Sequence, residues 1–169
     1  MHRSFLAIGL FLLAAGCATA PTPGNPVKPP AASNIPPDAL VTQRGLLTIH
    51  GRQFSLTGYV ACSESEGLRL ILTENFGGVL ADVLIKPDGN VFVMRWKPPF
   101  RPAWIQKYVA ADAQCVFGKN AQPPCPVRLS GPNHFIIERR AYRLDLQTVE
   151  IKPGAQKASL FDPATKSAP

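Results

Sequence analysis

The chain has 169 residues and a formal net charge of +7, from 18 lysine and arginine residues against 11 aspartate and glutamate residues. About 110 residues lie between two ends that carry no core-forming pattern, which is the size of one domain and excludes several large ones. The positive charge suits nucleic acid or anionic lipid headgroups, although scattered basic residues are most often simply solvated.

The N-terminal segment is typical of a secretory signal. Arg3 precedes an apolar stretch over residues 5–13, and small residues follow up to Cys17. A signal peptide has an apolar core of roughly 7–15 residues, whereas a membrane-spanning helix needs about 20. We therefore predict a signal peptide over residues 1–16. An ordinary cleavable signal that happens to contain a cysteine is the alternative to a lipid-modified one.

The run Leu-Ala-Ala-Gly-Cys over residues 13–17 resembles the lipobox of bacterial lipoproteins, with Ala14 where leucine is usual. The resemblance implies that Cys17 is acylated and anchors the mature protein to membrane lipid. Ala18 follows the cysteine instead of aspartate, which by resemblance to sorted lipoproteins implies the periplasmic face of the outer membrane. An exported, tethered protein rarely meets nucleic acid, so no nucleic-acid partner is expected.

Both ends of the chain lack the pattern of a packed core. Residues 17–38 are rich in proline and small residues, a composition that forms an extended spacer of ~60 Å at most. Residues 153–169 have little periodicity and are predicted to be a flexible tail. The predicted domain is residues 39–152.

Apolar and polar residues alternate with a period of two through most of this domain, which predicts strands. The turn Pro87-Asp88-Gly89 joins two of them, because proline presets φ and glycine tolerates positive φ. The first five predicted strands cover residues 44–50, 54–62, 68–73, 79–86 and 90–96. Three more are predicted over residues 127–129, 134–139 and 142–147, the last of which could extend to residue 151.

One segment has a helical period. Apolar residues between 102 and 117 fall mainly on one helical face, Pro102 suits a helix start, and Gly118 suits its end. The sequence therefore predicts a mainly β protein of the α+β class. Its curved antiparallel sheet has seven or eight strands and is accompanied by one substantial helix.

The fourth and fifth predicted strands are apolar on both faces, whereas an antiparallel sheet with one wet face is polar on that side. One helix covers only one face. We therefore expect the second face to be covered by closure of the sheet on itself, by a loop, by a protein partner, or by an acyl chain in an apolar cavity. The candidate cavity residues are Ile71, Leu80, Leu84, Phe92, Met94 and Trp96.

Residues 45–117 resemble the Lol-type fold of the periplasmic lipoprotein carrier and its outer-membrane receptor. The resemblance lies in the order of the segments Gly-Leu-Leu-Thr-Ile-His, Phe-Ser-Leu-Thr-Gly-Tyr-Val-Ala, Leu-Arg-Leu-Ile-Leu and Gly-Gly-Val-Leu-Ala-Asp-Val, followed by the helix from Pro102. It implies an open half-barrel that binds lipid or lipoprotein acyl chains without covalent chemistry, as a carrier or acceptor. The alternative is an accessory lipoprotein that interacts with another envelope protein.

Two loops are candidate working parts. Phe76 lies between polar residues and glycines, and the resemblance to the outer-membrane receptor implies an exposed apolar residue there that touches membrane. Folding back over the end of the sheet is the alternative. Phe100 and Trp104 lie in a proline-rich, basic segment that suits a membrane interface or a lid. Capping of the core is the alternative there.

The remaining cysteines and polar residues give little sign of catalysis. Cys115 and Cys125 bracket a short loop and are the favoured disulfide pair, which leaves Cys62 as a small buried apolar residue. No Cys-x-x-Cys occurs, and no nucleophile, metalloprotease or phosphate-loop motif is present. We expect no enzyme activity, metal or cofactor.

Overall fold

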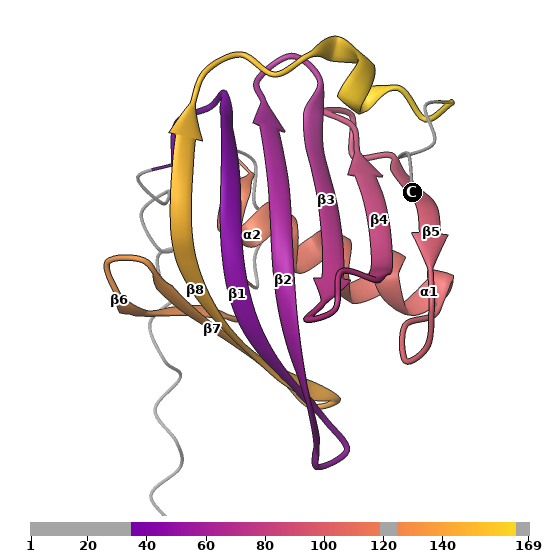
Figure 1. The fold of residues 1–169 in the computed structure, drawn as a ribbon, viewed down its shortest axis with the longest axis vertical. Helices are drawn as coiled ribbons and strands as arrows, with labels where there is room; N and C mark the ends of the chain where they lie inside the picture. The colour runs from indigo at the N-terminus through magenta and orange to yellow at the C-terminus, as the bar shows by residue number, and fades with distance from the viewer. Residues whose placement is uncertain (1–34, 119–124, 165–169) are drawn as a thin grey trace, which may run out of the picture.

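The computed structural model describes residues 35–118 and 125–164. Its main element is an antiparallel sheet of eight strands in the order β5-β4-β3-β2-β1-β8-β7-β6 (Figure 1). The two end strands do not pair with each other, so the sheet is an open half-barrel, as predicted. The strands are β1 (Ala39–Ile49), β2 (Arg52–Ser63), β3 (Gly67–Glu74), β4 (Val79–Ile85), β5 (Val91–Trp96), β6 (Val127–Gly131), β7 (His134–Arg139) and β8 (Tyr142–Pro153).

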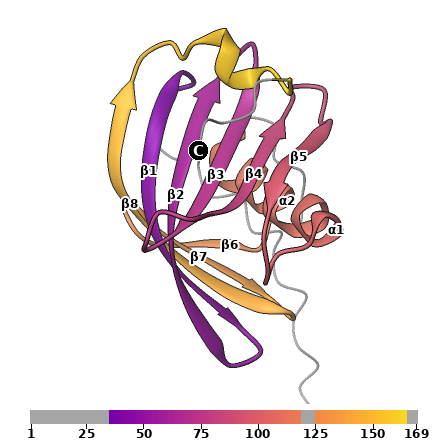
Figure 2. The ribbon, with the colours of Figure 1, turned by 45° about the vertical axis from the view of Figure 1, so that its right-hand side comes forward.

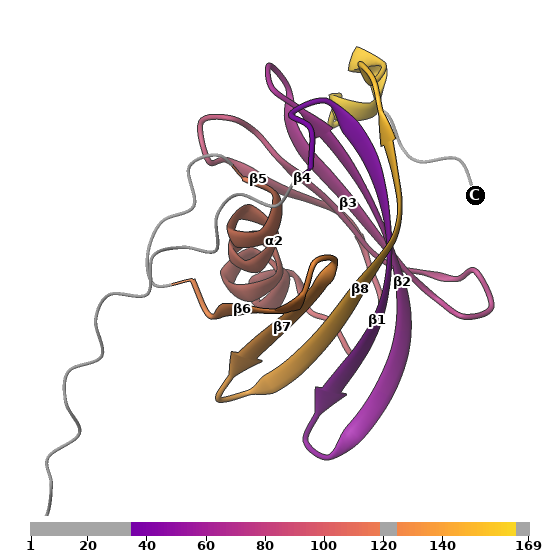
Figure 3. The same cartoon turned by 90° about the vertical axis from the view of Figure 1, so that its left-hand side faces the viewer.

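The helical segment between β5 and β6 crosses the inner face of this sheet. It runs continuously through α1 (Pro102–Trp104), the π-helical η1 (Ile105–Val109) and α2 (Ala110–Phe117). This confirms the predicted helix, although the sequence pattern did not indicate the π-helical turn. Figure 3 shows the sheet curling around the helix, with β6 and β7 on one side and β4 and β5 on the other.

The main core lies between the helix and the inner face of the sheet. Alternate residues of the strands point toward the helix because the side chains of a strand alternate between its faces. The fully buried valines Val41, Val60 and Val83 come from three different strands, and Ile105 and Ala110 face them from the helix. The sulfur atoms of Cys115 and Cys125 form a disulfide that joins α2 to the segment before β6.

The outer face of the sheet is covered in part by the end of the chain. After β8, the chain crosses toward β3 and forms the short 3-10 helix η2 (Ala158–Phe161) (Figures 1 and 2). Phe161 is 1% exposed and packs against Ala61 and Leu84. Residues 153–164 were predicted to belong to a flexible tail, but they supply a cover for the second apolar face.

Polar contacts fix this segment on the sheet. Arg69 donates two hydrogen bonds to Asp82, from Nε at 3.0 Å and from Nη2 at 2.9 Å. The remaining nitrogen of its guanidinium, Nη1, donates to the main-chain oxygen of Leu160 at 2.7 Å. The buried ion pair therefore positions a donor for the C-terminal segment.

The predicted signal peptide, the predicted acylation site Cys17 and most of the predicted spacer lie outside the described residues. Within residues 35–118 and 125–164, the helices are too short or too polar to cross a bilayer.

Candidate functional site

Three hollows follow one another along β2, and the second and third of them are bordered by the helical segment. Strand β2 contributes to all of them: Phe54 and Leu56 line the first, Leu56 and Gly58 the second, and Cys62 the third. Leu56 is shared by the first two hollows, and Phe117 by the last two. We call them the mouth, middle and far hollows, and together the track.

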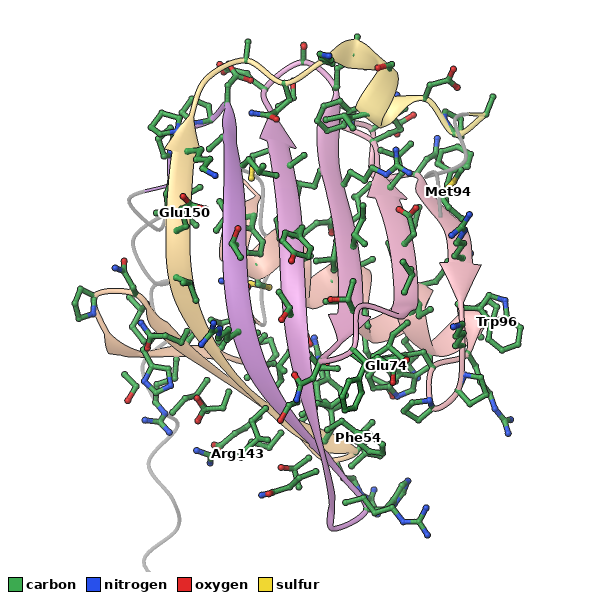
Figure 4. The ribbon with its side chains drawn as sticks, viewed as in Figure 1. Phe54, Glu74, Met94, Trp96, Arg143 and Glu150 are labelled. Carbon is green, nitrogen blue, oxygen red and sulfur yellow. A yellow bond between two sulfur atoms is a disulfide. The ribbon has the colours of Figure 1, made fainter. Side chains whose placement is uncertain are left out.

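The mouth hollow has a volume of about 270 Å³ and lies at the end of the sheet where the β3–β4 loop turns. Its walls come from Phe54 and Leu56 on β2, Leu80 on β4, and the segment Pro98-Pro99-Phe100 before the helix. Figure 4 shows Phe54 at this end of the sheet, near Glu74 at the end of β3. The mouth is therefore largely apolar and open to solvent.

The middle hollow is smaller, about 50 Å³, and lies beneath the helix. Most of its wall is aliphatic, from Leu56, Leu70 and Leu72 on the sheet and Val109 and Val116 on the helical segment. Its polar neighbours, Gln43 and Asp112, are engaged elsewhere. The Gln43 amide nitrogen donates to the Thr148 hydroxyl at 3.2 Å.

Asp112 is held by two partners on the β7–β8 hairpin. Its carboxylate accepts hydrogen bonds from Arg139 Nε at 2.9 Å and Nη2 at 2.6 Å, and another from the Tyr142 hydroxyl. Burial raises the pKa of the Asp112 carboxyl, and the hydrogen bonds from Arg139 and Tyr142 partly offset that rise. Burial also raises the pKa of Tyr142, and the neighbouring carboxylate adds to that rise. The cluster fastens α2 to the hairpin.

The far hollow has a volume of about 150 Å³ and lies at the opposite end of the helix. Its apolar floor includes Cys62, Leu68 and Phe117, and its rim includes Lys86, which pairs with Glu66 at 3.5 Å. Cys62 is a buried free thiol. Burial, with a smaller effect of the Asp38 charge, raises its pKa to about 12. The thiol is therefore protonated at neutral pH and acts as an apolar wall.

The structure does not gather the six predicted cavity residues into one cavity, and in this respect the prediction is wrong. Leu80 lines the mouth hollow. Ile71, Leu84 and Phe92 lie on the outer face: Leu84 is buried under Phe161, and Phe92, opposite Leu84, is 40% exposed. The physical reason is that the helix packs on the inner face of the sheet, so residues that point to the outer face cannot line a hollow beside the helix.

Met94 and Trp96 belong to the edge strand β5 and do not line any of the three hollows. The β4–β5 register shifts by one residue between Asp82 and Val83, which leaves Met94 as the extra residue of a bulge. Trp96 is 48% exposed and points away from the edge of the sheet (Figure 4).

The three predicted membrane or lid residues have different environments. Phe76 is 98% exposed at the tip of the β3–β4 loop. Phe100 is only 2% exposed, and Trp104 packs between it and Tyr142 with tilted rings, whose centroids lie 5.4 Å and 5.0 Å away. Phe100 and the half-buried Trp104 therefore cap the core, whereas Phe76 is fully exposed.

Sequence reasoning missed two glycines, Gly45 and Gly58, that line the middle hollow from adjacent strands. A glycine inside an alternating strand is a signal that another group approaches closely or that space is kept. That signal was available in the sequence. Among the described residues, no group of three histidine, cysteine or acidic side chains is placed to hold a metal ion.

Comparisons with known proteins add no family to this geometry. Neither the family models nor the curated protein sequences contain a match to this chain.

Proposed function

We propose that this protein is an envelope lipoprotein, anchored through acylated Cys17 at the periplasmic face of the outer membrane, that binds acyl chains of lipids or lipoproteins without covalent chemistry. The observation that carries the proposal is the track: an open half-barrel whose inner face is apolar and incompletely filled by its helix. Each buried CH₂ group contributes about 0.8 kcal/mol, so such a site needs shape and apolar walls but few polar contacts.

For a long chain to bind, the helix and the β2–β4 part of the sheet have to separate, while α2 stays fastened to the β7–β8 hairpin through Asp112. Pockets for drug-sized ligands measure roughly 300–1,000 Å³, and the middle hollow is about 50 Å³. Away from that hairpin, the helix contacts the sheet through aliphatic side chains such as Ile105 and Val116, and these contacts are not directional. An acyl chain that slides between helix and sheet replaces one set of apolar contacts with another.

The mouth hollow is the proposed entrance because Phe76 lies on its rim. The main-chain N–H of Gly77 donates to the oxygen of Glu74 at 2.9 Å, and the positive φ of Gly77 turns the chain so that Phe76 stands clear. Lys97 and Arg101, both exposed, flank the neighbouring segment of the mouth. An exposed aromatic ring with nearby cations suits contact with lipid acyl groups and headgroups.

The second candidate function is an accessory protein that binds another envelope protein. The observation that favours it is the set of apolar side chains exposed on and beside the outer face, namely Tyr59, Phe92 and Trp96. This face does not border the track, so the two functions predict different sensitive residues.

Matched substitutions on the two faces distinguish these proposals. The mature chain with Cys17→Ser is titrated with a fluorescent fatty acid and examined by native mass spectrometry for co-purified lipid. We expect saturable binding that Phe54→Asp at the mouth weakens at least tenfold and that Phe92→Asp on the outer face leaves unchanged. Absence of binding by the folded parent, or equal loss in both variants, contradicts the carrier proposal. A stable protein complex lost only with Phe92→Asp supports the accessory function.

A further inference from the structure

Gly58 occupies a position where a side chain is expected. It is buried on the inner face of β2, between the inward residues Leu56 and Val60. A glycine inside a strand is unfavourable, because it loses more conformational freedom on folding than other residues and contributes no packing. Its presence therefore calls for a reason that offsets this cost.

Backbone conformation and close packing do not supply that reason. The positive-φ glycines of the described chain are Gly51, Gly67, Gly77, Gly89 and Gly154, and Gly58 is not one of them. A Cβ atom added to Gly58 would meet its nearest neighbour, Cδ2 of Leu72, at 3.5 Å, an ordinary contact. Gly45 differs, because its Cβ would lie 2.9 Å from Cδ2 of Leu146.

Because Gly58 has no side chain, the space next to it remains empty and forms part of the middle hollow. Gly58 forms part of the floor of this hollow, opposite Val109 and Val116 of the helical segment. Leu56, two residues earlier, is shared with the mouth hollow. Val60, two residues later, is fully buried and lines neither the middle nor the far hollow. The wall that β2 provides is therefore open at Gly58 and closed at the next inward position.

We propose that Gly58 sets the length of acyl chain that the track accepts, by keeping open the space that receives the methyl end of a chain entering at the mouth. The distance along β2 from Phe54 to Gly58 is roughly 14 Å, from four residues at about 3.4 Å each. Short chains end before Gly58 and long chains reach it. This inference rests on the proposed acyl-chain binding and adds that the preferred ligands are defined by the length of their acyl chain.

The test uses the mature chain with Cys17→Ser and displacement of a fluorescent fatty acid by saturated fatty acids from octanoate to stearate. Gly58→Val fills the middle hollow with a side chain that suits a strand. We expect it to weaken the binding of palmitate and stearate about tenfold, the effect of denying burial to roughly two CH₂ groups, and to leave octanoate unchanged. The methyl group of Gly58→Ala fits the hollow, and we expect this variant to bind palmitate and stearate with affinities between those of the parent and of Gly58→Val.

Two controls make the outcome specific. Thr57→Val places the same side chain on the outer face of β2 and is expected to leave the length preference unchanged. Unfolding midpoints report the fold, and Gly58→Val is expected to match or exceed the parent because it fills a hollow.

The possible failures are distinguishable. If the parent binds fatty acids and folded Gly58→Val or Gly58→Ala keeps the parent's length preference, the role of Gly58 is overturned and acyl binding stands. An equal loss for all chain lengths also overturns it, since that indicates a general distortion. If the folded parent binds no fatty acid, the proposed function and the inference fall together.

Discussion

Asp112 in α2 and Arg139 at the end of β7 form an ion pair in which one buried carboxylate oxygen accepts two hydrogen bonds from the partly exposed guanidinium, from Nε at 2.9 Å and from Nη2 at 2.6 Å. The Arg139 guanidinium also lies 5.5 Å from the centre of the Tyr108 ring, so it contacts two turns of the helix. Apolar packing alone allows a helix to slide. This pair fixes its position relative to the hairpin, and the disulfide at Cys115 fixes the next turn.

Removing the Asp112 carboxylate should destabilise the fold. Asp112→Ala leaves the Arg139 charge and the Tyr142 hydroxyl without their partner; breaking a fully buried pair costs about 3 kcal/mol or more, and the partial exposure of Arg139 makes about 2–3 kcal/mol the expected loss here. Urea unfolding measures the change. The control is Asp145→Ala, whose pair with His134 is about one-third exposed and contributes less than about 1 kcal/mol. Equal losses in the two variants would contradict a special role for the Asp112–Arg139 pair.

Phe161 should contribute strongly to stability although it lies near the end of the chain. Its side chain is 1% exposed against Ala61 and Leu84, and truncating a buried phenylalanine to alanine costs about 3 kcal/mol. We expect Phe161→Ala to lower the free energy of unfolding by that amount. Leu160→Ala is the matched control, since Leu160 is 36% exposed. A Phe161→Ala variant as stable as the control would show that the segment does not pack on the sheet.

The Cys62 thiol should make stability depend on pH in the alkaline range. Its pKa rises from 9.0 to about 12 on folding, so the folded state favours the protonated form. The unfolded state then loses its proton first, and this thiol's contribution is constant below pH 9 and falls as pH rises from 9 to about 12. Urea unfolding at pH values on both sides of 9 measures the loss, which Cys62→Ala should reduce. A thiol reagent should react with Cys62 only after unfolding.

Phe76 should be dispensable for folding and important at a membrane. It is 98% exposed, so Phe76→Ser is expected to leave the unfolding midpoint unchanged. Burying a phenylalanine side chain in an apolar phase gains about 1.5–3 kcal/mol, which corresponds to roughly tenfold or more in partitioning onto lipid vesicles. Co-sedimentation with vesicles of mixed zwitterionic and anionic lipid measures this. Phe92→Ser serves as the control, and equal retention of both variants on vesicles would rule out a role for Phe76.

The local structure was largely predictable because it depends on short-range rules. Alternation identified the strands, and the turn before Asn90 forms as expected: Gly89 has a φ of 89° and its N–H donates to the oxygen of Lys86 at 2.9 Å. The helix over residues 102–117 follows from its period and from Pro102.

The faces of the central strands were not predictable from alternation. Leu80 and Leu84 are four residues apart and were expected on one face. The β3–β4 register shifts between Leu72 and Thr73, so Leu80 joins the main core while Leu84 packs under Phe161. A bulge reverses the phase of a strand without changing its composition. Both faces of β4 are indeed covered, as the apolar composition of this strand indicated. The cover of the outer face was not predictable, because Phe161 is a single aromatic residue in a polar segment and no periodic pattern links it to Leu84.

The packing of η2 on the outer face has a consequence for how the protein matures. Leu84 is synthesised before its cover, Phe161, which follows β8 in the chain. A nascent chain, or one cleaved after β8, can complete all eight strands and still expose the apolar surface around Leu84 to other molecules. Until residues 154–161 have been synthesised and have packed on the sheet, the apolar patch around Leu84 stays open to association with other chains, and a protease that removes the segment after β8 would expose it again.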